Sequence, residues 1–273
     1  MLTRLYSSWL LLLFILPACV SGKDSPPLAE GEWYRPALGL SWQWQLSGEL
    51  NTAYRVDVYD IDLFDTPPKL IREIQANGSK VICYFSAGSY EKWRADAKVF
   101  KKGVLGHPLA DWPGERWLDI RSDQVLSIMK KRLDIAVEKG CDAVEPDNMD
   151  AYSNDSGFKL SAEDQLSFNR KLANEAHKRG LAIGLKNDVE QVSELVEYFD
   201  FAVNEQCFEY QECDALKPFV QAGKAVFNAE YQTRYQKSEK AQKDLCQQAK
   251  KLGLSTLVLP LELDDSFRIS CLM

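Results

Sequence analysis

The sequence has 273 residues, of which 45% are apolar and 27% charged, and its net charge is −7 at pH 7. This length suits one large domain, and about 250 residues is typical of a single (β/α)8 barrel. The acidic balance argues against nucleic acid as a partner, because nucleic-acid-binding domains usually carry basic patches. It is compatible with a cationic or neutral ligand.

The first segment has the pattern of a targeting sequence and not of a folded element. In residues 1–22 a basic residue precedes a short apolar run, and small residues follow, which indicates a secretory signal peptide. We therefore expect a protein that is secreted, periplasmic or at the cell surface. Cys19 lies in a stretch similar to a lipoprotein box, although its proline fits poorly, so a lipid anchor there is the one membrane attachment left open. Residues 23–40 are expected to be a tether, and residues 41–273 the domain.

Six cysteines follow the signal peptide, and an exported protein can pair them. Cys207 and Cys213 are the best local disulfide pair, and Cys246 with Cys271 could hold the C-terminus. Cys83 and Cys141 lie in apolar contexts, where we expect buried thiols. The cysteine and histidine spacings predict no zinc site, and no metal or cofactor is expected.

Eight apolar runs end in polar or small residues and predict strands. They lie at 41–46, 56–64, 80–88, within 142–150, and at 181–188, 201–207, 224–231 and 255–261. Helical patterns separate most of them, at 67–77, 123–139, 161–179, 189–198, 212–222 and 238–252. Alternating strands and helices favour a parallel sheet, and eight strands favour its closure into a (β/α)8 barrel.

The expected barrel is irregular. Too few residues separate the first two strands for a helix, and the chain ends soon after the eighth strand, so the first and last helices should be short or missing. Residues 89–118 form a long insertion rich in tryptophan, which would form one wall of a cleft.

Polar residues gather at the predicted strand ends, where a (β/α)8 barrel carries its active site. Candidates for this rim are Asp60, Tyr84, Glu145, Asp147, Asp150, Lys186, Asn187, Glu205, Glu230 and Tyr231. Glycoside hydrolysis needs two carboxyl groups that flank one bond, one protonated and one ionised. Asp147 and Glu205 follow strands two apart in the predicted order, and we expect them to form this catalytic pair.

The other candidates have two interpretations each. Asp60, Lys186 and Glu230 could contact sugar or form structural pairs, and Tyr84 and Tyr231 could hydrogen-bond sugar hydroxyls. Glu145 and Asp150 could support the pair or bind a cation such as Ca2+. Trp42 could stack on sugar or belong to the core. Asn187 is expected at the binding site as well.

Five stretches resemble the glycoside hydrolase family 114 domain, in the same order. They are Trp42–Gly48, Val58–Asp62, Val81–Gly88, Val144–Asn148 and Asn204–Cys207. The resemblance implies a (β/α)8 barrel with endo-α-1,4-polygalactosaminidase activity on partly deacetylated galactosaminogalactan, a cationic amino-sugar polysaccharide. It also implies Asp147 as nucleophile and Glu205 as acid/base, with retention of configuration.

Two other functions remain open from the sequence. A sugar-binding barrel without catalysis would keep an aromatic cleft but would need no paired acids. A metal-dependent hydrolase could use Glu145, Asp147 and Asp150, although the shortage of histidine ligands counts against it.

Overall fold

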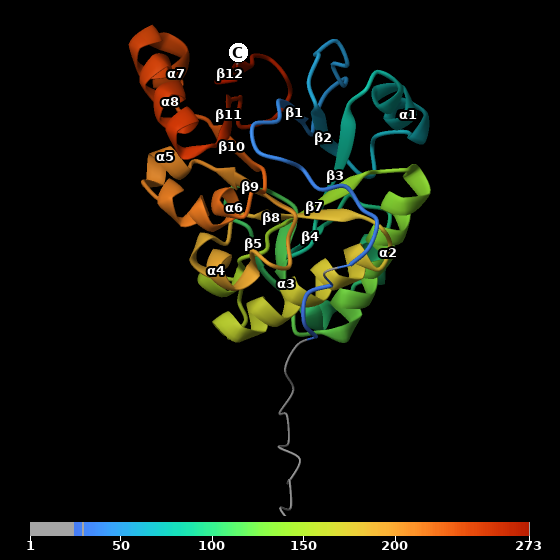
Figure 1. The fold of residues 1–273 in the computed structure, drawn as a ribbon. Coiled ribbons are helices and arrows are strands. Elements are labelled where there is room, and N and C mark those ends of the chain that lie inside the picture. The colour runs from blue at the N-terminus through green and yellow to red at the C-terminus, as the bar shows by residue number, and fades with distance from the viewer. Residues whose placement is uncertain (1–24, 29, 273) are drawn as a thin grey trace, which may run out of the picture.

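A computed structural model describes residues 25–28 and 30–272 of the chain. The expected signal peptide, with Cys19, lies outside these residues. The largest element is one curled sheet of nine strands in the order β1-β2-β3-β7-β8-β9-β10-β11-β12 (Figure 1). The first eight strands in this order pair in parallel, and β12 (Ile269–Ser270) adds antiparallel to β11.

All eight predicted barrel strands are present. They are β1 (Trp42–Gln45), β2 (Val58–Asp62), β3 (Lys80–Ser86), β7 (Ala143–Asp147), β8 (Ala182–Lys186), β9 (Phe201–Glu205), β10 (Val226–Glu230) and β11 (Ser255–Val258). The helices are α1 (Pro68–Ala76), α2 (Asp123–Lys139), α3 (Ala162–His177), α4 (Val192–Leu195), α5 (Cys207–Tyr210), α6 (Lys217–Gln221), α7 (Thr233–Lys237) and α8 (Glu239–Leu252). The fold class, an irregular (β/α)8 barrel, is confirmed.

Local chemistry explains where the long helices begin and end. The Ser122 side chain accepts from Gln124 N at the start of α2, and Gly140 ends this helix with a left-handed φ of 84°. Ser161 and Asp164 form a capping box at the start of α3.

Contacts outside a regular ladder complete the ring, among them backbone hydrogen bonds from Leu46 N and Ser47 N to Leu263 O. No backbone ladder joins β1 to β11 in the described part of the chain, and no helix follows either strand there. Instead Trp42 Nε1 donates to Ser255 O at 2.9 Å, and Arg268 Nη2 donates to Trp42 O at 2.6 Å. The C-terminal segment therefore contributes to the closure between β1 and β11.

Two apolar cores lie on the two sides of the curled sheet. The inner core contains large rings from β1, β9 and β10, among them Trp44, Phe201 and Phe227. The outer core lies between the strands and the helices and contains residues such as Phe85 and Leu172. Buried positions therefore alternate along each strand between the two cores, as the period of two requires.

The insertion after β3 forms its own antiparallel sheet of β4 (Ser89–Glu91), β6 (Glu115–Leu118) and β5 (Leu105–Pro108). The sequence predicted an insertion here but not its strands. Trp93 and Trp112 are exposed in this region, and Trp117 is buried.

The segment expected as a tether packs against the barrel over its described part (Figure 1, blue). Trp33 stacks on His177 with ring centroids 4.2 Å apart, and its Nε1 donates to Asp200 Oδ1 at 2.8 Å. Farther along, Ala225 N donates to Pro36 O at 3.1 Å. These contacts place the segment across the N-terminal ends of β9 and β10.

Three disulfides join all six cysteines of the described region. Cys207–Cys213 forms as expected, and Cys246–Cys271, which the sequence left open, forms as well. The expectation of buried thiols at Cys83 and Cys141 is wrong, because these residues form a disulfide with Cα atoms 6.1 Å apart. The two are 58 residues apart in sequence and meet because β3 and β7 are neighbours in the sheet.

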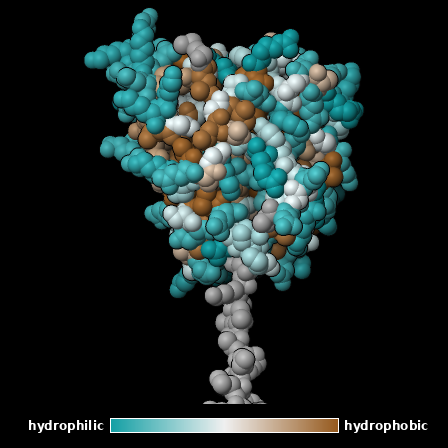
Figure 2. Space-filling model, viewed as in Figure 1, coloured by the Kyte–Doolittle hydropathy of each residue, from teal (hydrophilic) through white to brown (hydrophobic). Residues whose placement is uncertain are grey.

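Hydrophilic residues cover most of the surface seen in Figure 2, and hydrophobic residues gather in a band toward one side. No helix in residues 25–28 and 30–272 is both long and apolar enough to cross a membrane.

Candidate active site

The last residues of three adjacent barrel strands meet inside the rim. Asp147 ends β7, Lys186 ends β8 and Glu205 ends β9, and the sheet order places Lys186 between the two acids. Strand alternation directs each toward the interior, because residues two and four positions earlier on β9, Val203 and Phe201, belong to the inner core.

One ammonium group holds the acids together. Lys186 Nζ lies 3.0 Å from Asp147 Oδ1, 3.2 Å from Glu205 Oε2 and 3.4 Å from Glu145 Oε1. Because the contacts of 3.0 Å and 3.2 Å share the Nζ atom, those oxygens of Asp147 and Glu205 are separated by at most their sum, about 6.2 Å. The structure thus brings the expected pair together at one point.

Asp147 is held in place by three donors. Besides Lys186, Tyr84 OH donates to its Oδ2 at 2.9 Å, and Asn148 N donates to its Oδ1 at 2.6 Å. These donors fix the orientation of the Asp147 carboxyl group.

Glu205 has a different set of partners. Tyr231 OH donates to its Oε1 in a short hydrogen bond, and Asn187 Nδ2 lies 3.5 Å from its Oε2. Asn187 Oδ1 also accepts from the backbone N of Glu205 at 2.9 Å, so it positions the strand end. The structure therefore places Tyr84, Asn187 and Tyr231 against the acid pair and not in a separate part of the cleft.

Burial separates the acids that a ligand can reach from those it cannot. The side chains of Asp147 and Glu205 are 19% and 25% exposed, whereas Asp60 and Glu145 are 0% exposed. Glu145 lies close enough to Asp60 for the charge of Asp60 to raise its pKa, but no oxygen of either carboxyl group has a hydrogen-bond partner among the described residues. Because both side chains are fully buried, direct contact of either with sugar is not supported.

The pKa values of these groups follow from burial and charge. Burial raises the pKa of Asp60 to about 7, and burial with the Asp60 charge raises that of Glu145 well above its usual range. Burial alone would lower the pKa of Lys186, but Asp147, Glu205 and Glu145 outweigh it and raise that pKa well above 10.5. Lys186 is therefore a fixed positive charge.

Asp150 lies near the pair and is half-buried. Burial and, to a lesser degree, the nearby charge of Asp147 raise its pKa to about 6. Trp44 and not Trp42 lies beside the cluster, since its ring centroid is 5.0 Å from Lys186 Nζ.

Two further expected contacts with substrate are not supported by the structure. Trp42 is 1% exposed and donates to the backbone of β11. Glu230 is fully buried and accepts from Phe208 N in α5, on the outer side of β10. Tyr231, the next residue, faces inward instead.

Among the residues that the structure describes, no group of three or more His, Cys, Asp or Glu side chains is arranged to hold a metal ion. Lys186 Nζ occupies the position between the carboxylates that a cation would take.

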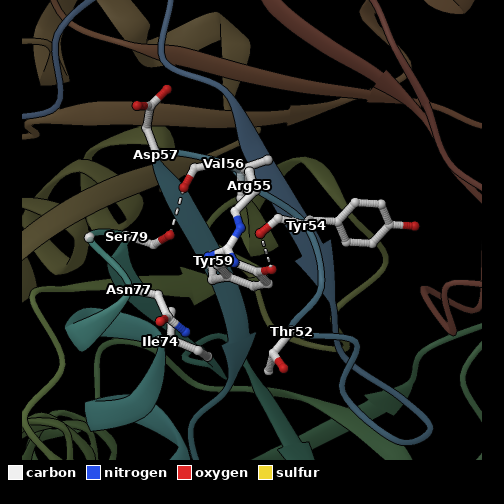
Figure 3. A pocket seen from close by; sticks show the side chains of 10 residues that line it. Thr52, Tyr54, Arg55, Val56, Asp57, Tyr59, Ile74, Asn77 and Ser79 are labelled. Carbon is white, nitrogen blue, oxygen red and sulfur yellow. Dashed lines mark hydrogen bonds between the residues drawn. The ribbon is translucent and has the colours of Figure 1, made fainter.

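A separate cavity of about 240 Å3 lies near the opposite ends of β2 and β3 (Figure 3). Its lining includes Tyr54, Arg55, Asp57 and Tyr59, and Ser79 Oγ donates to Val56 O there at 2.6 Å. None of the acids around Lys186 lines it. We therefore place the active site at the rim and not in this cavity.

A (β/α)8 barrel with two reachable acids at the carboxyl ends of strands two apart defines the class of two-carboxylate glycoside hydrolases. The family model described as glycoside-hydrolase family GH114 matches residues 23–273, and the chain belongs to this family. It is a glycosidase, as the resemblance in the sequence implied.

Solved structures agree with this assignment. The crystal structure of Aspergillus fumigatus Ega3 in complex with galactosamine is 42% identical, with a TM-score of 0.82, and the match covers 92% of this chain and 100% of that one. The glycoside hydrolase domain of PelA from Pseudomonas aeruginosa is 15% identical, with a TM-score of 0.68 over 85% of this chain and 99% of that one. The second likeness shows the fold alone. No curated protein matches the sequence.

Proposed function

We propose that this glycosidase cleaves an α-1,4-linked, galactosamine-containing polysaccharide with Asp147 as nucleophile and Glu205 as acid/base. The substrate class is supported by the likeness to Ega3, which was crystallised with galactosamine. The net charge of −7 and the acidic rim also suit a cationic chain, because opposite potentials concentrate a charged substrate.

The observation that carries the roles is the shared contact with Lys186. An oxygen separation of at most about 6.2 Å places both carboxyl groups within reach of one glycosidic bond. It is compatible with the roughly 5–5.5 Å of retaining enzymes. The three donors on Asp147 support its assignment as the nucleophile.

The reaction then has two steps. Glu205 gives its proton to the glycosidic oxygen as the C1–O bond breaks, and an Asp147 oxygen bonds to C1. Water next loses a proton to Glu205 and attacks C1, which releases Asp147 as carboxylate. Tyr84 and Lys186 keep Asp147 aligned, so little reorganisation is needed at the moment of attack.

The test combines hydrolysis of deacetylated galactosaminogalactan with product stereochemistry. We expect Asp147→Asn and Glu205→Gln each to lower kcat by at least about 10³-fold, as loss of either carboxyl function requires. The matched exposed-site controls Asp244→Asn and Glu138→Gln should be unchanged. Proton NMR of the first product should show the α anomer. Undiminished cleavage by both site variants would refute the assignment of the catalytic pair. A first-formed β anomer would refute retention of configuration. Binding without turnover by the wild type would indicate a carbohydrate-binding protein.

We also propose that the protein is exported. The segment 1–22 and the three disulfides support this, because disulfides persist in oxidising compartments. Mass spectrometry of the mature protein should find cleavage near residue 22, or a lipid-modified Cys19 at the new N-terminus. A mature protein that retains residues 1–22 would contradict export by this route.

A further inference from the structure

Two buried acids lie opposite each other in the inserted sheet but have unequal partners. Glu91 on β4 and Glu115 on β6 are direct cross-strand neighbours, 2% and 8% exposed. Glu91 forms salt bridges to Arg94 at 2.8 Å and to Arg132 at 3.2 Å. Within the described chain no salt bridge reaches Glu115. Because a buried carboxyl group without a cation is costly, the location of Glu115 needs an explanation.

Glu115 is one end of a chain of hydrogen bonds that leads to the active site. Ser89 Oγ donates to Glu115 Oε2 at 2.5 Å, and Ser89 Oγ lies 2.7 Å from Ser86 Oγ. Asn148 Nδ2 donates to Ser86 Oγ at 2.8 Å. Both serines are completely buried, so water does not compete for these bonds.

Donor counting gives this chain a direction. Ser86 Oγ accepts from Asn148 Nδ2 and also from Ser89 N at 3.1 Å, which uses both of its acceptor positions. Its own hydrogen is therefore left for Ser89 Oγ, and the Ser89 hydrogen goes to Glu115. An ionised Glu115 thus orients every bond back to Asn148.

Asn148, at the other end of this chain of hydrogen bonds, determines the orientation of Asp147. Asn148 has a left-handed φ of 59°, and its N donates to Asp147 Oδ1 at 2.6 Å. The carbonyl oxygen of Asp147 accepts from Ala87 N at 2.9 Å and Gly88 N at 3.0 Å. A Cβ at Gly88 would lie 1.7 Å from Asn148 O, so the two loops are in close contact. The peptide after Asp147 is therefore clamped on both sides.

We infer that Glu115 is a positioning residue for Asp147, which it orients through Ser89, Ser86 and Asn148. This inference rests on the proposed catalytic role of Asp147. The inserted sheet then supports the active site by more than its contribution to the cleft wall.

Protonation of Glu115 should weaken this support. Burial is the largest cause that raises the pKa of Glu115 to about 7, and the charges of Glu91 and Asp147 act in the same direction. The hydrogen bond from Ser89 and the charge of Arg94 oppose this shift. Below this pH a protonated Glu115 can donate to Ser89 and reverse the chain. Activity should therefore fall as pH drops through about 7.

The test is a comparison of Glu115→Gln and Ser89→Ala with the wild type, with kcat and KM measured from about pH 5 to about pH 9. The side-chain oxygen of glutamine can still accept from Ser89 but does not titrate. We expect Glu115→Gln to lose the acid limb near pH 7 with KM within about twofold. Ser89→Ala should lower kcat about tenfold at high pH, because a small misplacement of a reacting group is costly. The matched control is Ser255→Ala, at a buried serine on β11 that takes no part in this chain of hydrogen bonds.

The outcomes separate this inference from the proposed function. A wild type without hydrolysis refutes both. Hydrolysis by the wild type with an unchanged pH profile in Glu115→Gln refutes the positioning role alone. If Glu115 served the fold only, Glu115→Gln would lower the melting temperature and leave the acid limb in place. We expect the reverse, and Ser89→Ala supplies a second measurement if one variant fails to fold.

Discussion

Two clusters of buried charged residues lie on this barrel, and their charges are balanced differently. The active-site cluster has one cation, Lys186, among the acids Asp60, Glu145, Asp147 and Glu205. The anchor cluster ties the inserted sheet to the barrel and has two cations, Arg94 and Arg132, among the acids Asp62, Glu91 and Asp96.

The acids of the two clusters also differ in how many hydrogen-bond and ion-pair partners they have. In the anchor cluster every acid has a guanidinium contact between 2.5 and 3.2 Å. In the active-site cluster neither oxygen of Glu145 accepts from a hydrogen-bond donor, and the same is true of Asp60. Paired charges stabilise a fold only modestly, whereas an excess of buried acids opposes it. An unbalanced cluster in a cleft is therefore evidence for function.

The largest effect is expected when the single cation of the active-site cluster is removed. Lys186→Met should lower kcat about 10³-fold, because loss of one preorganised charge at the reacting groups typically costs this much. Steady-state hydrolysis measures it, with the exposed Lys251→Met as control. Retention of more than about a tenth of wild-type kcat would show that Lys186 serves folding and not catalysis.

Removal of a cation from the anchor cluster should act on stability instead. Arg132 is fully buried, contacts Glu91 and Asp96, and donates to Ser86 O at 2.7 Å. Arg132→Met should lower the free energy of unfolding by about 3–5 kcal/mol, because buried acids lose their partner. Urea denaturation of the oxidised protein checks this, with the exposed Arg72→Met for comparison. A change below about 1 kcal/mol would remove the contrast between the clusters.

The excess acids of the active-site cluster predict a pH-dependent cost. The pKa of Asp60 is about 7 in the fold against 3.8 as a free group. Between these values the folded state binds more protons than the unfolded state, so the free energy of unfolding falls as pH rises, and the whole cost is present above about pH 7. Asp60→Asn cannot titrate, so it should flatten this fall and stabilise the protein at pH 8 by on the order of 1–3 kcal/mol. Denaturation midpoints at pH 4 and pH 8, with Asp244→Asn as control, measure it. An equal fall in both proteins would mean that Asp60 carries no such cost.

Much of this organisation could be predicted from the sequence, because a change from apolar to polar residues marks the end of each strand. Apolar runs closed by polar residues located all eight barrel strands, and the helical pattern at 123–139 located α2. In a parallel barrel the carboxyl ends of the strands share one rim. The order of the strands alone therefore predicted that Asp147 and Glu205 lie near each other.

What the sequence could not show depends on which side of a strand a residue faces and on which strands touch. Glu230 and Tyr231 are consecutive, and because side chains alternate along a strand, both cannot face the interior. This alternation could have removed Glu230 from the expected substrate-binding residues. The Cys83–Cys141 disulfide needed the contact between β3 and β7. Glu115 had no signal at all, because its role depends on a strand pairing within an insertion.

The smallest effect is expected at the edge of the anchor cluster. Asp65 contacts Arg94 at 3.3 Å, but its side chain is 80% exposed, while Asp62 on the same guanidinium is 7% exposed. Solvent screens the exposed pair, so Asp65→Asn should change the free energy of unfolding by no more than about 0.5 kcal/mol. Asp62→Asn should cost several times more, since Asp62 also accepts from Phe64 N and Asp65 N. Urea denaturation of the two variants side by side decides the matter. Equal losses would mean that burial does not set the strength of these pairs, and the distinction between the two clusters would then rest on charge count alone.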